Sequence, residues 1–140
     1  MGKTVGVLAL QGDFEKHEAA LRRAGASRVV EVRTPGDLEG IAGLVIPGGE
    51  STTMLKLIGY ENLWEPLKNF GAEKPIFGTC AGVILLATEV LNPPQASFGL
   101  MDLGVERNAY GRQVDSHVGT IPFHGGDLEA VFIRAPIIRW

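Results

Sequence analysis

Short apolar runs alternate with segments of helical periodicity over the first two thirds of the chain, and this alternation constrains the fold most. In the segments between the runs, apolar residues recur every three or four positions, as on one face of an amphipathic helix. Parallel strands that are buried on both faces and joined by helices produce this pattern. The sequence therefore predicts an α/β fold with an open, mostly parallel sheet and helices on both faces. The expected strands are residues 3–10, 28–33, 43–46 and 75–77.

The expected helices have recognisable ends. The first begins after Asp13, a plausible N-cap, and stops at Gly25. Four residues recur at helical spacing within it, Phe14, His17, Leu21 and Ala24. A short helical turn is expected near residues 38–42, and two helices are expected over residues 54–58 and 63–70. A further helix follows the last parallel strand, where residues 83–87 have helical character.

The alternation ends after residue 91. Asn-Pro-Pro-Gln at residues 92–95 reads as a turn, and three further apolar runs follow without helical segments between them, at residues 103–107, 118–123 and 130–133. We therefore expect some antiparallel strands in this part. No repeat or linker interrupts the chain, which predicts a single domain over residues 1–140. Residues 135–140 are apolar and bulky rather than polar, so we expect this domain to lack its C-terminal end.

Composition excludes several classes of protein. Hydrophobic residues make up 45% and charged residues 21%, which is ordinary for a soluble globular protein. The net charge of −3, without a basic patch, disfavours nucleic acid as a partner. No apolar run is long enough to span a membrane. The single cysteine cannot form an internal disulfide, so we expect a cytoplasmic protein.

That cysteine lies in the most informative local motif, Gly-Thr-Cys-Ala-Gly at residues 78–82. The motif joins an apolar run to a helical segment, like the G-x-S-x-G nucleophile elbow with cysteine in place of serine. Cys80 would then stand exposed at the carboxyl end of a strand and act as a nucleophile. The alternative is that Cys80 is a small buried hydrophobe, because free cysteine is among the most buried residue types.

A second loop follows another expected strand, with the sequence Pro-Gly-Gly-Glu-Ser-Thr-Thr at residues 47–53. The adjacent Gly48 and Gly49 expose consecutive N–H groups that suit an oxyanion, while the hydroxyl residues Ser51, Thr52 and Thr53 can cap the next helix. By itself this loop is better explained as a tight turn with an N-cap. The Lys and the spacing of a phosphate-binding loop are missing, so nucleotide binding has little support.

The two loops together predict acyl transfer. A cysteine nucleophile needs backbone N–H groups to hold the oxyanion. Ala81 supplies one such donor directly after Cys80, and the Gly48–Gly49 loop is the natural second source if its strand lies beside the elbow strand. The expected intermediate is a thioester on Cys80.

Six motifs, in register along almost the whole chain, resemble the class I, triad-type glutamine amidotransferases, and more narrowly the glutaminase subunits of pyridoxal phosphate synthases. They lie at residues 6–14, 47–54, 77–82, 99–102, 107–113 and 131–136. The resemblance implies a flavodoxin-like fold and hydrolysis of L-glutamine to L-glutamate and ammonia. It also implies transfer of the ammonia to a (β/α)₈-barrel synthase partner in a large heteromeric complex. It implies no cofactor and no metal.

The same resemblance assigns roles to particular positions. Cys80 becomes the nucleophile, with Gly48, Gly49, Ala81 and Gln11 in the oxyanion region or its coupling to the partner. The positions implied to hold glutamine are Gly49, Glu50, Ser51, Arg107, Ile133 and Arg134. An arginine suits the α-carboxylate of glutamine, and Glu50 suits its α-ammonium. From the residues alone, we would expect both arginines to be solvated surface charges, and Gln11 could equally be a plain turn residue.

One part of the family pattern is missing. The resemblance implies a catalytic His-x-Glu motif, which does not occur in residues 1–140, and His17, His117 and His124 do not fit that role. Two alternatives therefore stay open. One is another cysteine hydrolase or a DJ-1-like protein on the same fold, and the other is a catalytically silent subunit in which Cys80 is buried.

Overall fold

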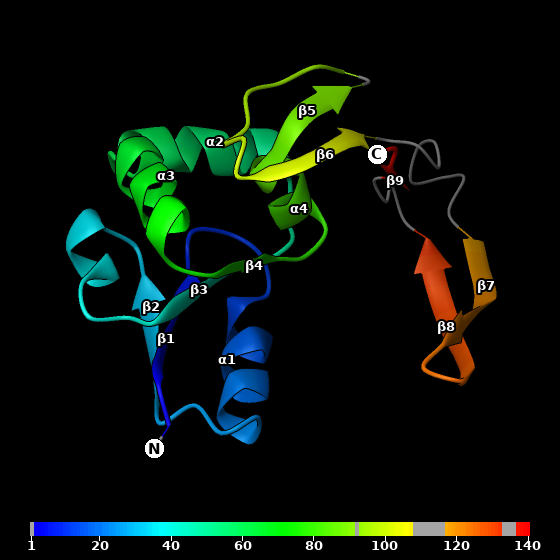
Figure 1. Cartoon of the computed structure of the whole chain (residues 1–140), viewed down its shortest axis with the longest axis horizontal. Coiled ribbons are helices and arrows are strands. Elements are labelled where there is room, and N and C mark those ends of the chain that lie inside the picture. The colour runs from blue at the N-terminus through cyan, green and yellow to red at the C-terminus, as the bar shows by residue number, and fades with distance from the viewer. Residues whose placement is uncertain (1, 92, 108–116, 133–136) are drawn as a thin grey trace.

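Four parallel strands form the centre of the structure, a computed structural model that describes residues 2–91, 93–107, 117–132 and 137–140 (Figure 1). The strand order is β2-β1-β3-β4. Val5 of β1 pairs with Val29 of β2 and with Gly43 of β3, and Leu44 of β3 pairs with Ile76 of β4. All four predicted parallel strands are confirmed. Their bounds are β1 (Thr4–Leu8), β2 (Arg28–Val32), β3 (Gly43–Ile46) and β4 (Ile76–Gly78).

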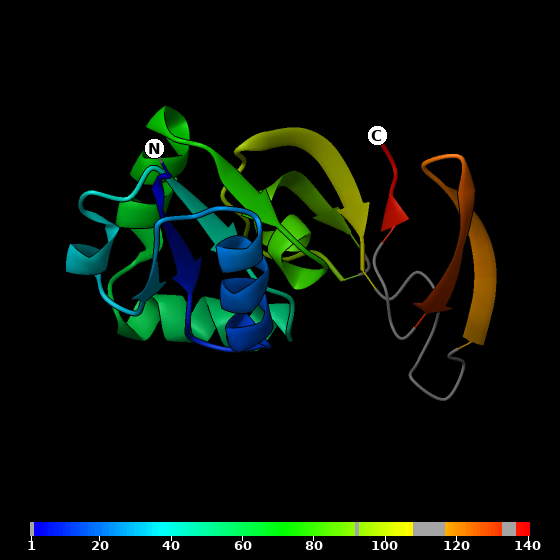
Figure 2. The ribbon, with the colours of Figure 1, turned by 90° about the horizontal axis from the view of Figure 1, so that it is seen from below.

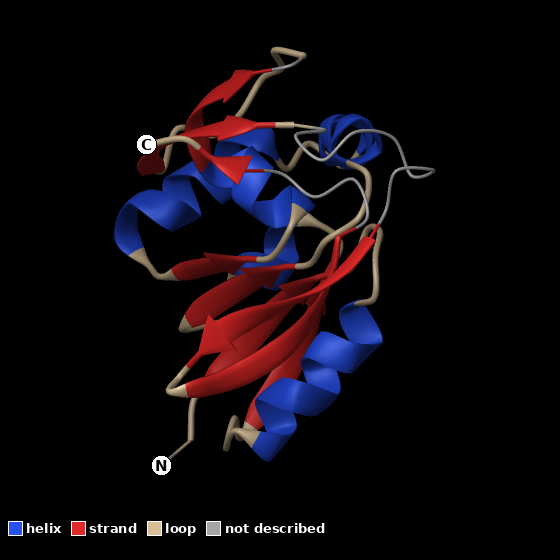
Figure 3. Cartoon of the chain, turned by 90° about the vertical axis from the view of Figure 1, so that its right-hand side faces the viewer, coloured by secondary structure: helices blue, strands red, loops and turns tan. Residues whose placement is uncertain are grey.

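Helices cover both faces of this sheet, as predicted. Figure 3 shows α1 (Phe14–Arg23) against one face, and α2 (Ser51–Tyr60) and α3 (Trp64–Glu73) on the other side. A short 3₁₀ helix, η1 (Pro35–Leu38), follows β2. The main apolar core lies between the sheet and the helices α2, α3 and α4 (Ala81–Leu86). Its fully buried side chains include Leu8, Ile46, Met54, Ile58, Leu67 and Leu85.

The first helix ends where the sequence predicts, but its N-terminal cap and its buried residue differ from the prediction. It ends before Gly25, whose φ of 103° suits glycine, as expected. Asp13, however, makes no side-chain capping bond and instead lies 3.1 Å from the Lys16 ammonium. The residue that α1 buries is Glu18, only 8% exposed. Burial raises the pKa of Glu18, and the neighbouring Glu31 carboxylate on β2 adds to the rise.

The predicted helix after the elbow is confirmed as α4 (Ala81–Leu86). It is followed directly by the strand β5 (Ala87–Leu91), which the sequence did not predict and which takes up Ala87. β5 pairs in parallel with β6 (Met101–Glu106), and the Thr88 hydroxyl donates to the carbonyl of Met101 at 2.7 Å. Pairing with a distant strand therefore overrides the local helical pattern.

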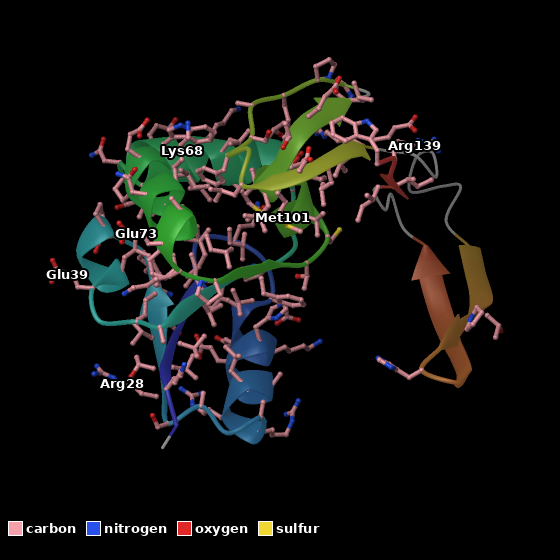
Figure 4. The ribbon with its side chains drawn as sticks, viewed as in Figure 1. Arg28, Glu39, Lys68, Glu73, Met101 and Arg139 are labelled. Carbon is pink, nitrogen blue, oxygen red and sulfur yellow. The ribbon has the colours of Figure 1, made fainter. Side chains whose placement is uncertain are left out.

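Antiparallel pairing occurs in the C-terminal part, as expected. The short strand β9 (Ile137–Ile138), which the sequence did not predict, runs antiparallel to β6. Arg139 forms an ion pair with Glu106, and Figure 4 shows Arg139 close to the end of β6. The indole ring of Trp140 covers Gly104, where a Cβ atom would lie 2.5 Å from the ring.

A separate hairpin holds the other two strands, β7 (His117–Phe123) and β8 (Gly126–Phe132). They pair antiparallel, with Thr120 opposite Glu129. The turn at His124 and Gly125 has positive φ at both residues. Figures 1 and 2 show this hairpin standing away from the central sheet. The predicted strands at residues 118–123 and 130–133 are thus confirmed as far as residue 132.

Candidate functional site

Cys80 occupies a sharp turn between β4 and α4. Its φ of 49° and ψ of −110° lie outside the regions that residues with a side chain ordinarily adopt. The turn is closed by backbone hydrogen bonds from Thr79 N to the Ile46 carbonyl at 3.1 Å and from Gly82 N to the Thr79 carbonyl at 2.8 Å. The thiol is exposed. The alternative of a buried, inert cysteine is therefore wrong.

The flanking glycines are required by close backbone contacts. A Cβ atom on Gly82 would lie 2.3 Å from the carbonyl oxygen of Ile46, the last residue of β3. A Cβ atom on Gly78 would lie 2.7 Å from the carbonyl carbon of Gly82. Any larger residue would push α4 away from β3 and β4. The glycines therefore determine where the amino end of α4 lies, and with it the position of Cys80.

The Gly48–Gly49 loop lies directly against Cys80. A Cβ atom on Gly48 would meet the Cβ of Cys80 at 3.1 Å. This contact follows from the sheet order, because β3 and β4 are neighbours and their carboxyl ends meet at one edge. The first backbone turn also belongs to this edge, since a Cβ atom on Gly12 would lie 1.9 Å from the Gly48 carbonyl oxygen. Three loops that are distant in sequence thus meet at this edge, with the Gly48–Gly49 loop between the first turn and Cys80.

Gln11 fixes the conformation of the Gly48–Gly49 loop. Its Oε1 atom accepts a hydrogen bond from the backbone N–H of Glu50 at 2.8 Å. The same oxygen would lie 2.7 Å from a Cβ atom on Gly49, whose φ of 155° also favours glycine. Gln11 is therefore more than a turn residue: its side chain bridges β1 and the loop after β3.

Glu50 is the N-cap of α2. Its Oε2 atom accepts from the Thr53 N–H at 2.8 Å, from the Thr53 hydroxyl at 2.9 Å and from the Thr52 hydroxyl. Partial burial alone would raise its pKa, but these bonds favour the carboxylate and lower the pKa to about 2. The expectation that Ser51, Thr52 or Thr53 caps this helix is wrong. The hydroxyl groups of both threonines instead bond to the capping carboxylate.

Arg107 adds a positive charge to the site, next to Glu50. Its guanidinium lies 3.6 Å from Oε1 of Glu50, and its side chain is only 12% exposed against 45% for Glu50. A half-buried cation thus sits beside a carboxylate that stays ionised. The expectation that Arg107 is a solvated surface charge is wrong. Ile133 and Arg134, which the sequence also nominates, lie outside the described residues.

No sequence motif indicated a role for Gln95, yet this residue contacts Ser51 at the start of α2. Ser51, only 3% exposed, donates its hydroxyl hydrogen to Oε1 of Gln95 at 3.2 Å. Gln95 belongs to the loop between β5 and β6, and its position beside α2 depends on the unpredicted strand β5. A lone glutamine in a Pro-Pro-Gln-Ala turn carries no signal that would have identified it.

The described residues contain neither a metal site nor a membrane span. Among them, no group of three or more His, Cys, Asp or Glu side chains could hold a metal ion. None of the helices they form is both long and apolar enough to cross a membrane. Of the histidines, His17 is half-buried on α1 and His124 is in the turn of the distant hairpin.

Comparison with protein families gives a match over nearly the whole chain: the SNO glutamine amidotransferase family profile covers residues 7–140. A curated relative from Solibacter usitatus, named pyridoxal 5'-phosphate synthase subunit PdxT, is 59% identical over 98% of this chain and 75% of its own length. The subunit of the same name from Deinococcus radiodurans is 52% identical over 96% of this chain and 72% of its own length. This chain therefore spans about three quarters of these relatives.

Solved structures support the same relationship. A crystal structure of a glutamine amidotransferase matches with a TM-score of 0.80 and 45% identity, over 97% of this chain and 74% of that protein. A putative peptidase E from Listeria monocytogenes matches with a TM-score of 0.61 over 73% of this chain and 64% of that protein. At 18% identity, the second similarity concerns the fold alone.

Proposed function

The chain belongs to the SNO glutamine amidotransferase family, and we propose that it is the glutaminase subunit of a pyridoxal 5'-phosphate synthase. In this role it hydrolyses L-glutamine to L-glutamate and ammonia. The observation that carries the proposal is the contact between the exposed Cys80 and the Gly48–Gly49 loop. A nucleophile and a source of oxyanion donors thus lie side by side at the carboxyl edge of the sheet.

The reaction begins with attack of the Cys80 sulfur on the side-chain amide carbon of glutamine. The carbonyl oxygen takes the negative charge of the tetrahedral intermediate, and the N–H of Ala81 and an N–H of the Gly48–Gly49 loop donate to it. Collapse of the intermediate breaks the C–N bond as the proton given up by the thiol passes to the departing nitrogen, so ammonia leaves and a γ-glutamyl thioester remains on Cys80. Water then cleaves the thioester to glutamate and restores the thiol.

Recognition of the amino-acid head group falls to the Glu50–Arg107 pair. Glutamine carries an α-ammonium and an α-carboxylate, and the two side chains present the opposite charges 3.6 Å apart. The carboxylate of Glu50 takes the ammonium, and the guanidinium of Arg107 takes the carboxylate. Gly49 and Ser51 contribute backbone groups from the start of α2, and Ile133 and Arg134 complete the set of residues assigned to glutamine.

Ammonia release is useful only beside an acceptor, so the partner is a synthase subunit. We propose that this partner is a (β/α)₈ barrel, that the complex is cytoplasmic, and that docking adjusts the oxyanion loop. Gln11 is the residue through which docking acts, because its bond to the Glu50 N–H holds the loop at 2.8 Å. Gly49 permits the peptide to rotate, since its φ of 155° already lies where other residues are strained.

Labelling of Cys80 tests the proposal directly. A glutamine analogue with an alkylating diazoketone in place of the amide should label Cys80 at least about tenfold faster than a shorter diazoketone that lacks the amino-acid head group, a factor worth about 1.4 kcal/mol. Saturating L-glutamine should protect Cys80, and D-glutamine should not. The Cys80→Ala variant should take up no label, as measured by mass spectrometry of the intact protein.

Glutamate release in the presence of the synthase subunit gives the second readout. The wild-type chain should release glutamate faster with the synthase than without it, and Cys80→Ala should release none. Equal labelling by both diazoketones, or labelling that L-glutamine does not slow, would refute the assignment of glutamine as the substrate.

A further inference from the structure

The side chain of Gln95 combines one satisfied polar atom with one orphaned polar atom. Its Oε1 accepts the Ser51 hydroxyl at 3.2 Å, but its Nε2 is closed to solvent and has no hydrogen-bond partner. Among the described side chains, only one other buried polar atom shares this condition, Oε1 of Glu18. The carboxyl group of Glu18 can bind a proton and so become neutral when it is buried, whereas the amide of Gln95 does not change its protonation and keeps its unpaired N–H donor.

An orphaned buried donor is unfavourable for folding, so its position calls for an explanation. Gln95 is bonded to Ser51, the first residue of α2, and the preceding residue is Glu50 with its partner Arg107. The orphaned donor is therefore held at the amino end of α2, on a side chain bonded to the residue that directly follows Glu50. A carboxylate is purely an acceptor and is the kind of group that an unused amide donor would serve.

We propose that Gln95 is a substrate-binding residue, whose Nε2 group donates to the α-carboxylate of the bound amino acid while Oε1 holds Ser51. This inference rests on the proposed function, since it takes the substrate to be a free α-amino acid. The last torsion of a glutamine side chain is broad, so we infer that the amide adjusts when the ligand binds, within the range that keeps Oε1 bonded to the Ser51 hydroxyl. The free protein thus keeps an unmet donor that the substrate satisfies.

The Gln95→Met variant tests this inference, because methionine has a similar length and no polar group. The free variant loses the orphaned donor but also the acceptor of the buried Ser51 hydroxyl, so the two effects on Tm offset each other and Tm should stay within a few degrees of the parent. Its Kd for L-glutamine should rise about tenfold, which is the loss of one hydrogen bond to a charged group. Both are measured in a Cys80→Ala background, by thermal unfolding and calorimetry, so that glutamine is not consumed.

A purely structural role predicts a different relationship between the two measurements. If Gln95 only positions Ser51, no orphaned donor offsets the loss of its acceptor, so Gln95→Met lowers Tm by more than a few degrees and weakens the binding of every ligand equally, which overturns the inference. A ligand without the carboxylate, 4-aminobutanamide, sharpens the comparison. Its affinity should change by less than twofold between parent and variant, and an equal tenfold loss for both ligands would likewise count against a carboxylate contact.

Two further variants serve as controls. Gln95→Glu keeps the acceptor for the Ser51 hydroxyl but replaces the donor with a second oxygen, so its glutamine affinity should fall further than that of Gln95→Met. Asn69→Met removes an exposed amide from α3 and should leave glutamine binding unchanged. If the parent protein binds glutamine and Gln95→Met binds it equally well, this inference fails alone. If the parent does not bind glutamine at all, the proposed function fails with it.

Discussion

The two strand-to-helix turns at the site are built in different ways. The turn after β4 is determined by backbone packing: Gly82 lies where a Cβ atom would be 2.3 Å from the Ile46 carbonyl, and Cys80 is held at a φ of 49°. The turn after β3 is held by side chains, since Gln11 bonds to the Glu50 N–H and the Glu50 carboxylate caps α2. The first turn cannot change without moving a helix, whereas the second can change by breaking one hydrogen bond.

This difference matches the tasks that the two turns have in the proposed reaction. A nucleophile is most effective when its position does not vary, because small displacements of the attacking atom lower the rate strongly. The loop that supplies oxyanion donors is the part that a partner can adjust. Placing rigid and adjustable elements on neighbouring strands keeps them in contact, at 3.1 Å between Cys80 Cβ and a Cβ built on Gly48.

The largest effect should follow from breaking the rigid turn. Gly82→Ala places a methyl group 2.3 Å from a backbone oxygen, which only a shift of α4 can relieve. We expect a loss of about 3 kcal/mol in the free energy of unfolding, measured by urea titration. A loss below about 0.5 kcal/mol would show that this turn is as adaptable as its neighbour.

The cap of the adjustable turn should contribute less. Glu50→Gln removes the charge that accepts from Thr52 and Thr53, and we expect α2 to lose about 1 kcal/mol at pH 7. Because the folded pKa of about 2 lies below the ordinary 4.5, the contribution is complete above about pH 4.5 and is lost as the pH falls toward 2.

The measurement is the difference in unfolding free energy between wild type and Glu50→Gln across this pH range. The difference should shrink toward pH 2, while slopes due to other carboxylates cancel. A difference that stays constant with pH would mean that the charge of Glu50 does not stabilise the cap.

A smaller effect is expected at Gln11. Gln11→Met removes the acceptor of the Glu50 N–H and should lower the free energy of unfolding by about 0.5–1 kcal/mol. The local signature is faster hydrogen exchange at the Glu50 amide, with the amides of α4 unchanged. Gln11→Glu keeps an acceptor oxygen and should retain most of the protection. Faster exchange in both turns would show that they are not independent.

The last substitution, Gly59→Ala, is the matched control for Gly82→Ala. Gly59 lies within α2, and no atom lies within 4 Å of the position its Cβ would occupy. Gly59→Ala should therefore raise the free energy of unfolding by about 0.5–1 kcal/mol through helix propensity and a less flexible unfolded chain. Opposite signs at Gly59 and Gly82 in thermal unfolding would confirm that packing, and not glycine itself, determines the cost.

Local patterns were sufficient for the parallel sheet and for the elbow. The four apolar runs give strands at the predicted places, and the motif at residues 78–82 is the exposed turn that its spacing indicates. Local patterns did not predict the features that depend on contacts between residues distant in the sequence. Residues 87–91 form β5 instead of continuing the helix because they pair with β6. Glu18 is buried because α1 packs against β2, where Glu31 lies beside it.

By itself, the sequence of this protein determined the alternation of strands and helices, the glycines around Cys80 and the motifs of its family. These are properties of residues close together in the chain, where backbone sterics and periodicity act directly. Only the tertiary structure decided which side chains meet. Sheet order placed Gly48 against Cys80, and long-range contacts joined Gln11 to the N–H of Glu50, Arg107 to its carboxylate and Gln95 to Ser51. Such contacts depend on the packing of whole elements, so no single stretch of sequence encodes them.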